Sequence, residues 1–139
     1  MSDLHQFTAV SIKGRGVLIE GAPGSGKSSL ALALIDRGAR LVGDDGVTLA
    51  ALEGRLTAGP APATAGLLEV RNVGLVAMPF LDRAAIALAI ALDPEAPRFI
   101  DAAEECRLLG LIIPKVRLWP DSPVLALRAE LALERYGLA

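Results

Sequence analysis

Residues 21–28 combine glycines, a lysine and a serine at the spacing typical of a phosphate-binding loop. They read Gly-Ala-Pro-Gly-Ser-Gly-Lys-Ser, which fits the pattern G-x-x-x-x-G-K-S. Glycines allow backbone N–H groups to turn toward phosphate oxygens, and the start of a helix adds the positive end of its dipole. Lys27 can reach the terminal phosphates, and the Ser28 hydroxyl can ligate Mg²⁺. We therefore expect a purine nucleoside triphosphate to bind here for phosphoryl transfer. The residues expected to contact it are Gly21, Ala22, Pro23, Gly24, Ser25, Gly26, Lys27, Ser28 and Ser29.

The sequence on both sides of this loop supports the interpretation. The apolar run 17–19 precedes the loop and predicts a short strand buried on both faces. Residues 27–37 follow as a predicted helix with Leu30, Ala31 and Leu34 on one face, and Gly38 lies where a left-handed cap is expected. The alternative is a glycine-rich turn with an exposed lysine. The strand before the loop and the helix after it favour phosphate binding.

Two adjacent carboxylates, Asp44 and Asp45, follow a short apolar strand predicted at 40–42. Phosphoryl transfer to an alcohol needs an acidic metal partner and a base. Neighbouring carboxylates also repel each other, so their pairing is costly unless a cation or a proton lies between them. The sequence Asp-Asp-Gly also suits an Asx turn, and that structural alternative stays open beside the favoured functional one.

A second polar pair, Glu69 and Arg71, lies two residues apart on a predicted extended segment that begins with the strand at 67–70. Side chains at this spacing point to the same side of a strand. They could form a second acidic ligand with a phosphate-binding arginine, or a solvated ion pair of little energetic value. The residue types alone do not decide between these two interpretations.

The remaining elements follow from hydrophobic periodicity and from breaker residues. In residues 84–92 alanine favours helix, but Ile86, Leu88, Ile90 and Leu92 fall at alternate positions, which predicts a strand with these side chains on one face. Ser122 and Pro123 are a suitable N-cap and first position for a terminal helix ending near residue 136. The other predicted elements are a hairpin over 7–20 with its turn at 14–16, an extended 47–49, a turn at 53–54, a mobile loop at 59–66, a short helix at 102–109 and a strand at 111–118.

Composition narrows the class of protein. A chain of 139 residues with 53% hydrophobic residues predicts one compact domain, spanning 1–139, and the strands and helices predicted above make it an α/β domain. A net charge of -2 argues against nucleic-acid binding. The longest apolar run, 84–92, is shorter than the roughly 20 residues of a membrane helix. Without a secretory signal we expect a cytoplasmic protein, in which the single cysteine, Cys106, is a small packed residue.

Three segments together resemble a known family. The runs 16–28, 31–38 and 40–45 are similar to the catalytic domain of HPr kinase/phosphorylase, from Gly-Val-Leu-Ile-Glu-Gly to Arg-Leu-Val-Gly-Asp-Asp. The later run 67–74, Leu-Leu-Glu-Val-Arg-Asn-Val-Gly, resembles the second signature of that family, in which a glycine usually stands in place of Asn72. The similarity is dense over about 14–50 and 67–92, and it is more specific than the phosphate loop alone.

The resemblance implies a mechanism and a set of partners. It implies an ATP- and Mg²⁺-dependent serine kinase acting on HPr, the phosphocarrier of the sugar phosphotransferase system, with phosphorolysis as a possible reverse activity. It implies a P-loop domain of the phosphoenolpyruvate carboxykinase-like type, a mixed sheet with flanking helices, assembled as a homohexamer. By matching positions, Asp44 would be the base and Lys27 would hold the phosphates. Ser28, Asp45 and Glu69 would hold Mg²⁺, and Arg71 would face the same site.

The sequence departs from the family in three respects. It resembles the short forms that lack a separate N-terminal domain. The histidine expected near the first strand can only be His5, which Gln6 shifts by one position from the usual spacing. The family's C-terminal Pro-Gly-Arg-Asn type loop, tied to phosphorolysis, is not visible, although Lys115 and Arg117 lie in that part of the chain. Two other functions therefore remain open: an ATP-binding regulatory module without turnover, and a small P-loop kinase acting on a metabolite.

Overall fold

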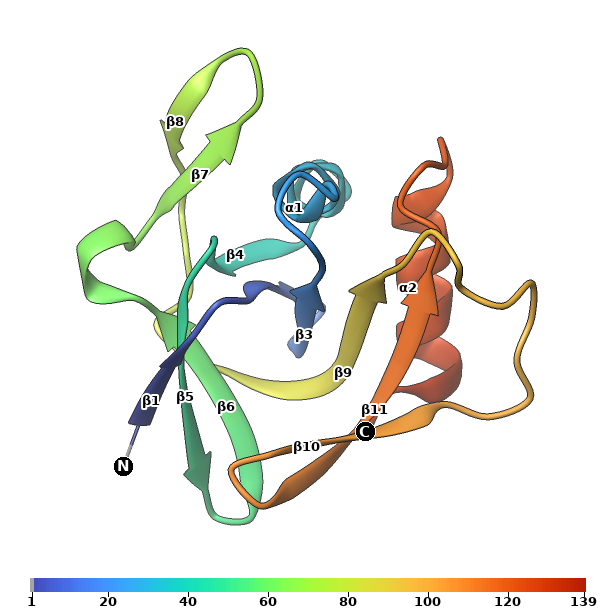
Figure 1. Cartoon of the computed structure of the whole chain (residues 1–139). Helices are drawn as coiled ribbons and strands as arrows, with labels where there is room; N and C mark the ends of the chain where they lie inside the picture. Colours follow the sequence, from blue (N-terminus) through green and yellow to red (C-terminus); the bar gives the residue numbers. More distant parts are fainter. Residues whose placement is uncertain (1) are drawn as a thin grey trace.

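The computed structural model describes residues 2–139 (Figure 1). In these residues a large mixed sheet, a separate two-stranded sheet and two α-helices make up the fold. The helices are α1 (Lys27–Asp36) and α2 (Leu125–Tyr136), with a single 3-10 turn at Pro62–Thr64. The strands are β1 (Ser2–His5), β2 (Thr8–Ile12), β3 (Arg15–Glu20), β4 (Arg40–Gly43), β5 (Val47–Leu52), β6 (Arg55–Pro60), β7 (Leu67–Val70), β8 (Gly74–Ala77), β9 (Ala84–Leu92), β10 (Glu104–Leu108) and β11 (Leu111–Leu118).

Strand β9 is the centre of the large sheet. The strand order is β1-β5-β6-β9-β3-β2-β4, and β11 also pairs with β9 and carries β10 on its outer edge. Strands β3 and β11 both run parallel to β9, whereas β2 is antiparallel to β3 and to β4. The carboxyl ends of β3, β4, β9 and β11 therefore point to the same edge of the sheet. That edge is where ligands bind in open α/β sheets.

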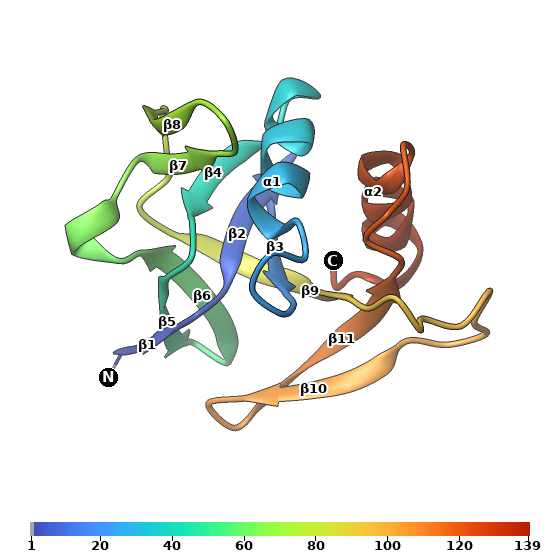
Figure 2. The ribbon, with the colours of Figure 1, turned by 45° about the horizontal axis from the view of Figure 1, so that its top comes forward.

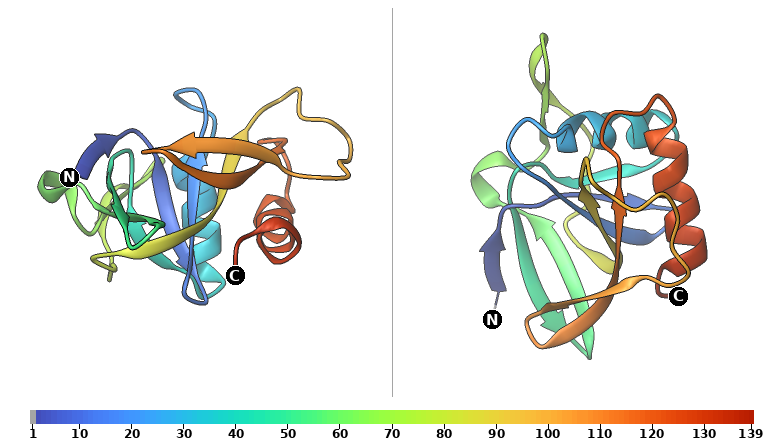
Figure 3. Two further views of the ribbon diagram at one scale, coloured as in Figure 1. Left: turned by 90° about the horizontal axis from the view of Figure 1, so that it is seen from below. Right: turned by 45° about the vertical axis from the view of Figure 1, so that its right-hand side comes forward.

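The two faces of this sheet bury different sets of side chains. Both helices cover one face of the sheet (Figures 2 and 3). On that face Leu30 and Leu34 of α1 and Leu133 of α2 pack with three sheet residues, Ile19, Ile90 and Val116. The other face curls so that β5, β6 and β10 close over Leu18, Ala89 and Ile113. The predicted mixed sheet with flanking helices is thus confirmed, with both helices on the same face. Neither helix of the described chain is long and apolar enough to cross a membrane.

Strand β9 confirms the prediction at 84–92 but corrects the expected single face. Leu88, Ile90 and Leu92 pack with the helices, whereas Ile86 belongs to the cluster on the opposite face. The pairing with β3 shifts register between Gly16 and Val17, which face Ile86 and Leu88 respectively. A bulge of this kind inserts one residue and inverts the alternation of faces.

Three hairpins of this chain turn on two residues that both have positive φ. They are Lys13 and Gly14 between β2 and β3, Glu53 and Gly54 between β5 and β6, and Leu109 and Gly110 between β10 and β11. Two-residue loops with this geometry match the right-handed twist of the strands they join. The turn predicted at 14–16 therefore lies one residue earlier, because Arg15 and Gly16 already belong to β3.

Three further expectations are corrected. The helix predicted at 102–109 is wrong, since β10 pairs there with β11 and buries part of Cys106 against the curled face. The loop predicted at 59–66 begins too early, because Gly59 and Pro60 are the last residues of β6. Gly59 is closely packed there, since a Cβ at this position would lie 2.5 Å from the Asp82 carbonyl oxygen. Helix α2 begins at Leu125, and the Ser122 hydroxyl accepts a hydrogen bond from Val124 N–H in the preceding turn.

Cys106 is the half-buried residue that composition suggested. It is the only cysteine among the described residues, and it is not in a disulfide. Burial raises the pKa of its thiol. A raised pKa keeps the sulfur protonated and weakly nucleophilic near neutral pH.

Candidate active site

The phosphate loop joins the carboxyl end of β3 to the start of α1. Gly24 and Gly26 have φ of +80° and +103°, and a Cβ on either would meet nothing within 4 Å. Glycine is therefore needed for the left-handed backbone and not for space. The first helical bond at this end runs from Leu30 N–H to the Gly26 carbonyl at 2.9 Å. The N–H groups before Leu30 lie in the first turn, where an α-helix offers them no partner of its own.

Lys27 and Ser28 point back toward the loop and the neighbouring strand end. The Lys27 ammonium donates to the Gly21 carbonyl at 3.0 Å, which folds the side chain over the loop. The Ser28 hydroxyl donates to Asp44 Oδ1 at 2.6 Å. Because its proton is used in this bond, the lone pairs of the Ser28 oxygen remain available to a cation. Ser29 is exposed on the same first turn of α1.

Asp44 is the buried carboxylate of the site. It is 7% exposed and follows β4, whose carboxyl end lies beside α1. Besides Ser28, it accepts hydrogen bonds from the Thr8 hydroxyl at 2.9 Å on Oδ1 and from Glu69 N–H at 2.9 Å on Oδ2. These donors fix the orientation of the carboxylate and stabilise its negative charge in a buried place. The structure therefore brings Ser28, Asp44 and the backbone of Glu69 together, while the ammonium of Lys27, the residue before Ser28, bonds to the Gly21 carbonyl.

The other predicted acidic and basic side chains lie at the surface around this group. Asp45 is exposed on the turn after Asp44, with a φ of 51° that is uncommon for a residue other than glycine. Glu69 and Arg71 are exposed at β7 and just after it. Within residues 2–139 no three His, Cys, Asp or Glu side chains gather closely enough to hold a metal ion by themselves. A hydroxyl, a carboxylate and phosphate oxygens are nevertheless the ligands that Mg²⁺ prefers, and the first two already meet here.

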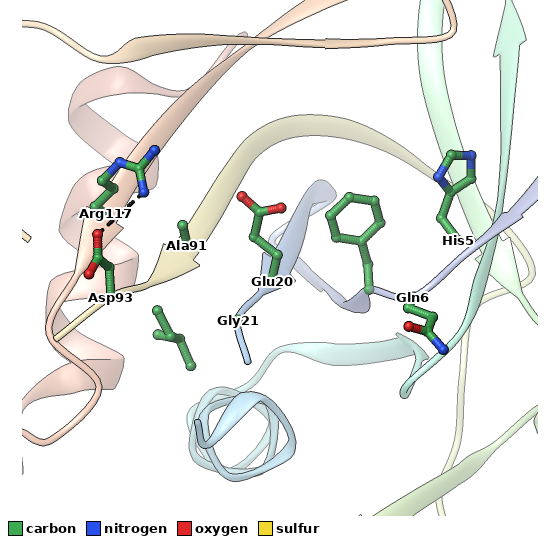
Figure 4. Close-up of a pocket in the computed structure, with 9 residues that line it drawn as sticks. His5, Gln6, Glu20, Gly21, Ala91, Asp93 and Arg117 are labelled. Atoms are coloured by element: carbon green, nitrogen blue, oxygen red, sulfur yellow. Dashed lines mark hydrogen bonds and ion pairs between the residues drawn. The ribbon is translucent and has the colours of Figure 1, made fainter. Parts of the chain in front are cut away.

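One cavity of about 490 Å³ opens on the β1 side of the loop (Figure 4). It is lined at one end by His5 and Phe7, whose rings are 6.1 Å apart, and at the other by Asp93 and Arg117. The His5 Nε2 atom is buried without a hydrogen-bond partner among the described residues. Asp44 does not line this cavity. His5 thus lines the same cavity as Gly21, whereas Ser28 and Asp44 do not line it.

Two cationic side chains of β11 near this cavity, Lys115 and Arg117, are both paired with carboxylates. Lys115 Nζ lies 2.5 Å from Glu20, the last residue of β3. Arg117 lies 3.3 Å from Asp93 and 2.7 Å from Glu104. The hydrogen bond from Arg117 holds the pKa of the Glu104 carboxyl below its usual value, and the same bond raises the pKa of Arg117. Both cations therefore already have negative partners at the edge of the site.

A second cavity, of about 500 Å³, borders residues 22–25 of the phosphate loop and shares Leu92 with the first. Ala22, Pro23, Gly24 and Ser25 line one wall. The facing wall consists of Leu92, Pro94, Pro120 and Asp121. The Ser25 hydroxyl oxygen is buried without a hydrogen-bond partner among the described residues. Cavities therefore border both Gly21 and residues 22–25 of the loop.

Two residues of the site were missed by sequence reasoning. Thr8 contacts Asp44 although its position in an apolar alternating strand gave no sign of a polar role. Glu20 lines the cavity beside Gly21, and its place at the end of a buried strand was a signal that could have been used.

Comparisons with known proteins identify the family to which the chain is similar. The family model described as HPr Serine kinase C-terminal domain matches residues 2–93. An HPr kinase/phosphorylase of Streptococcus thermophilus is 40% identical over 122 residues, covering 78% of this chain and 40% of that protein. An HPr kinase/phosphorylase of Clostridium tetani is 47% identical over 72 residues, covering 52% of this chain and 24% of that protein.

A solved structure extends the similarity to nearly the whole chain. The HPr(Ser) kinase/phosphatase from Coxiella burnetii superimposes with a TM-score of 0.84 at 25% sequence identity, over 95% of this chain and 94% of that one. The chain spans only 40% of the length of the Streptococcus relative that it matches.

Proposed function

The chain belongs to the HPr serine kinase C-terminal domain family, and on that premise we propose that it transfers the γ-phosphate of ATP to a serine of an HPr-like phosphocarrier protein. One observation carries the proposal. The hydroxyl of Ser28, at the end of the phosphate loop, donates at 2.6 Å to the buried carboxylate of Asp44. This contact places a phosphate-binding loop and an acidic group in the same site, as phosphoryl transfer requires.

The residues of the loop bind the triphosphate in this proposal. The free N–H groups of the first turn of α1 and the Lys27 ammonium face the phosphate oxygens. Lys27 exchanges its present acceptor, the Gly21 carbonyl at 3.0 Å, for a phosphate oxygen. The hollow between Pro23 and Pro94 leaves space for the rest of the nucleotide.

Asp44 is the proposed base. The acceptor serine oxygen forms a bond to the γ-phosphorus, the bond from that phosphorus to the ADP oxygen breaks, and the serine proton passes to Asp44. A carboxylate has about four lone-pair sites, and Ser28, Thr8 and Glu69 N–H occupy three of them in this structure. One site therefore remains for the proton of the acceptor.

The remaining assignments are also proposals. Ser28, Asp45 and Glu69 are the residues that would hold Mg²⁺, which when bound neutralises charge on the β- and γ-phosphates. Arg71 would meet the transferred phosphate from β7. His5 would act from the cavity beside Gly21, where its Nε2 atom is buried without a described partner.

At the level of the molecule we propose a P-loop domain of the phosphoenolpyruvate carboxykinase-like type. Its support is the order of strand, glycine loop and helix at β3 and α1 within a curled mixed sheet. We further propose one catalytic unit over 1–139, a homohexamer, and a cytoplasmic location in which ATP and the phosphocarrier are both present. Light scattering after size exclusion tests the hexamer, and a monomer at micromolar concentration contradicts it.

A labelling experiment tests the kinase assignment. The protein is incubated with Mg²⁺, the HPr-like protein encoded by the same genome, and ATP labelled at either the γ- or the α-phosphate. Transfer of γ-label alone is expected, because the bond to the γ-phosphorus is the one that breaks. Transfer of α-label would indicate nucleotidyl transfer instead. Binding of ATP without transfer of either label would favour a regulatory module.

A further inference from the structure

The Thr8 hydroxyl uses both its donor and its acceptor capacity on the two residues after β4. Thr8 is fully buried near the start of β2. Its Oγ1 donates to Asp44 Oδ1 at 2.9 Å and accepts the Asp45 N–H at 3.3 Å. A buried hydroxyl that only needed a partner could bond to any nearby carbonyl, as Thr57 does with the Ala50 carbonyl at 3.2 Å. The Thr8 hydroxyl instead bonds both to the side chain of Asp44, 36 positions away in sequence, and to the backbone of Asp45.

A backbone hydrogen bond also joins the turn after Asp44 to the residue that precedes β2. Gly46 N–H donates to the Phe7 carbonyl at 3.0 Å, one residue before Thr8. Between these contacts Asp45 adopts the left-handed backbone, at a φ of 51°. A side-chain-bearing residue in this region is strained and persists only when its surroundings hold it. The bond from Asp45 N–H to Thr8 is one of the contacts that do so.

The hydrogen bonds of Asp44 differ in whether they can survive nucleotide binding. Ser28 lies on the phosphate loop, so its hydroxyl must adjust when phosphates and a cation arrive. Thr8 and Glu69 N–H lie on β2 and β7, and they bond to different oxygens of the carboxylate. Together they prevent rotation of the carboxylate while Ser28 changes its partner.

We propose that Thr8 is a positioning residue for phosphoryl transfer, which holds the Asp44 carboxylate toward Ser28 through its hydroxyl. The role rests on the proposed kinase function, because it acts through Asp44. Removing the hydroxyl leaves Oδ1 with Ser28 alone, so the carboxylate can turn away from the reacting groups when the nucleotide binds. A misplaced catalytic group lowers the rate of the chemical step more than substrate affinity.

The test uses two variants at Thr8 and one matched control. Thr8→Val keeps the shape and removes the hydroxyl, whereas Thr8→Ser keeps the hydroxyl. Thr57→Val makes the same chemical change at a buried threonine of β6, whose hydroxyl bonds to the Ala50 carbonyl of β5 and not to Asp44. All three variants are compared with the wild type in melting temperature, in kcat and KM for transfer from ATP to the HPr-like protein, and in ATP affinity with and without Mg²⁺.

We expect Thr8→Val to lower kcat by about tenfold to a hundredfold, the effect of losing one hydrogen bond to a charged group, with little change in KM. Thr8→Ser should restore most of kcat, and Thr57→Val should keep it. The gain in ATP affinity on adding Mg²⁺ should also shrink in Thr8→Val alone, because Ser28 then faces a loose carboxylate.

Several outcomes overturn the proposal, and they are distinguishable. An unchanged kcat in Thr8→Val, or an equal loss in Thr57→Val, shows that Thr8 has only a structural role. If the wild type transfers no phosphate, the proposed function fails, and the Mg²⁺-dependent affinities then decide about Thr8. An equal Mg²⁺ effect in wild type and Thr8→Val contradicts positioning in that case. A wild type that binds no ATP refutes both proposals.

Discussion

At the scale of single residues, the site depends on one cation and one buried carboxylate. The Lys27 ammonium lies over the loop, where it donates to the Gly21 carbonyl, and Asp44 accepts a hydrogen bond from the Ser28 hydroxyl. Positive charge placed where negative charge develops, and a base held in place, are the main contributions of protein side chains to phosphoryl transfer.

We predict that Lys27→Ala weakens nucleotide binding and abolishes transfer. The variant loses the ammonium that neutralises the terminal phosphates, whereas the loop glycines and the helix start remain. Calorimetric titration with ATP and a transfer assay measure the two effects. Turnover at the wild-type rate would refute the assigned role of the phosphate loop.

For Asp44→Asn we predict that ATP still binds with Mg²⁺ while transfer to serine falls by about 10²- to 10⁴-fold, the usual contribution of a general base. Asp45→Asn is the comparison variant, because it changes the neighbouring exposed carboxyl group, which is proposed to hold Mg²⁺, and it should weaken Mg²⁺-dependent ATP binding without removing the base. Steady-state kinetics separate kcat from KM. If Asp44→Asn loses only nucleotide affinity and keeps its maximal rate, Asp44 is a metal ligand or a structural residue.

At the scale of elements, the helix that follows the loop ends in a glycine cap. Gly38 has a φ of +108°, and its N–H donates to the Ile35 carbonyl at 3.0 Å while Ala39 N–H donates to Leu34 at 3.0 Å. These bonds satisfy the last carbonyl groups of α1. A Cβ on Gly38 would meet nothing within 4 Å. A substitution at Gly38 therefore lowers stability only because a residue with a side chain disfavours this left-handed backbone conformation.

We predict that Gly38→Ala lowers the free energy of unfolding by about 1–2 kcal/mol, the cost of a left-handed conformation for an alanine. Gly38→Asn should lower the free energy of unfolding less than Gly38→Ala does, since asparagine tolerates this conformation better. Denaturant unfolding of the two variants and the wild type measures the differences. Equal stability of Gly38→Ala and wild type would show that the cap contributes nothing.

Elements with a strong local pattern were predictable from sequence, and those formed by pairing were not. Helix α1, β9 and the hairpin of β2 and β3 follow from apolar periodicity and glycine positions. Strand β10 was predicted as a helix because its stability comes from pairing with β11, a tertiary contact. The two-residue turn at Leu109 and Gly110 was the local signal for that hairpin.

The candidate site was predictable to a similar extent. Lys27, Ser28 and Asp44 come together as the loop pattern and the strand end suggested. Thr8 could not be found this way, because a threonine in a strand is common and its contact with Asp44 depends on how β2 and β4 pair. The bulge that moves Ile86 to the opposite face of β9 was hidden for the same reason.

At the scale of the whole molecule, charge around the site bears on the direction of the reaction. Phosphorolysis must hold a second anion beside the transferred phosphate, so it needs additional positive charge. Lys115 is paired with Glu20, and Arg117 is paired with Asp93 and Glu104. These pairs reduce the positive charge that the C-terminal half offers to an incoming phosphate.

We therefore predict that forward transfer is efficient, whereas removal of the serine phosphate by inorganic phosphate is slow. Release of pyrophosphate from serine-phosphorylated carrier, after addition of millimolar phosphate, measures the reverse reaction. Release as fast as forward transfer would mean that the paired cations suffice or that other groups replace them.

The central claim is that this chain phosphorylates a serine of an HPr-like protein through its phosphate loop. Mass spectrometry tests it directly: the HPr-like protein encoded by the same genome is incubated with ATP, Mg²⁺ and either the wild type or Lys27→Ala, and its modified residues are mapped. We predict one phosphoserine with the wild type and none with Lys27→Ala. An HPr-like protein left unmodified by a wild type that binds ATP, or modified equally by Lys27→Ala, would contradict the claim.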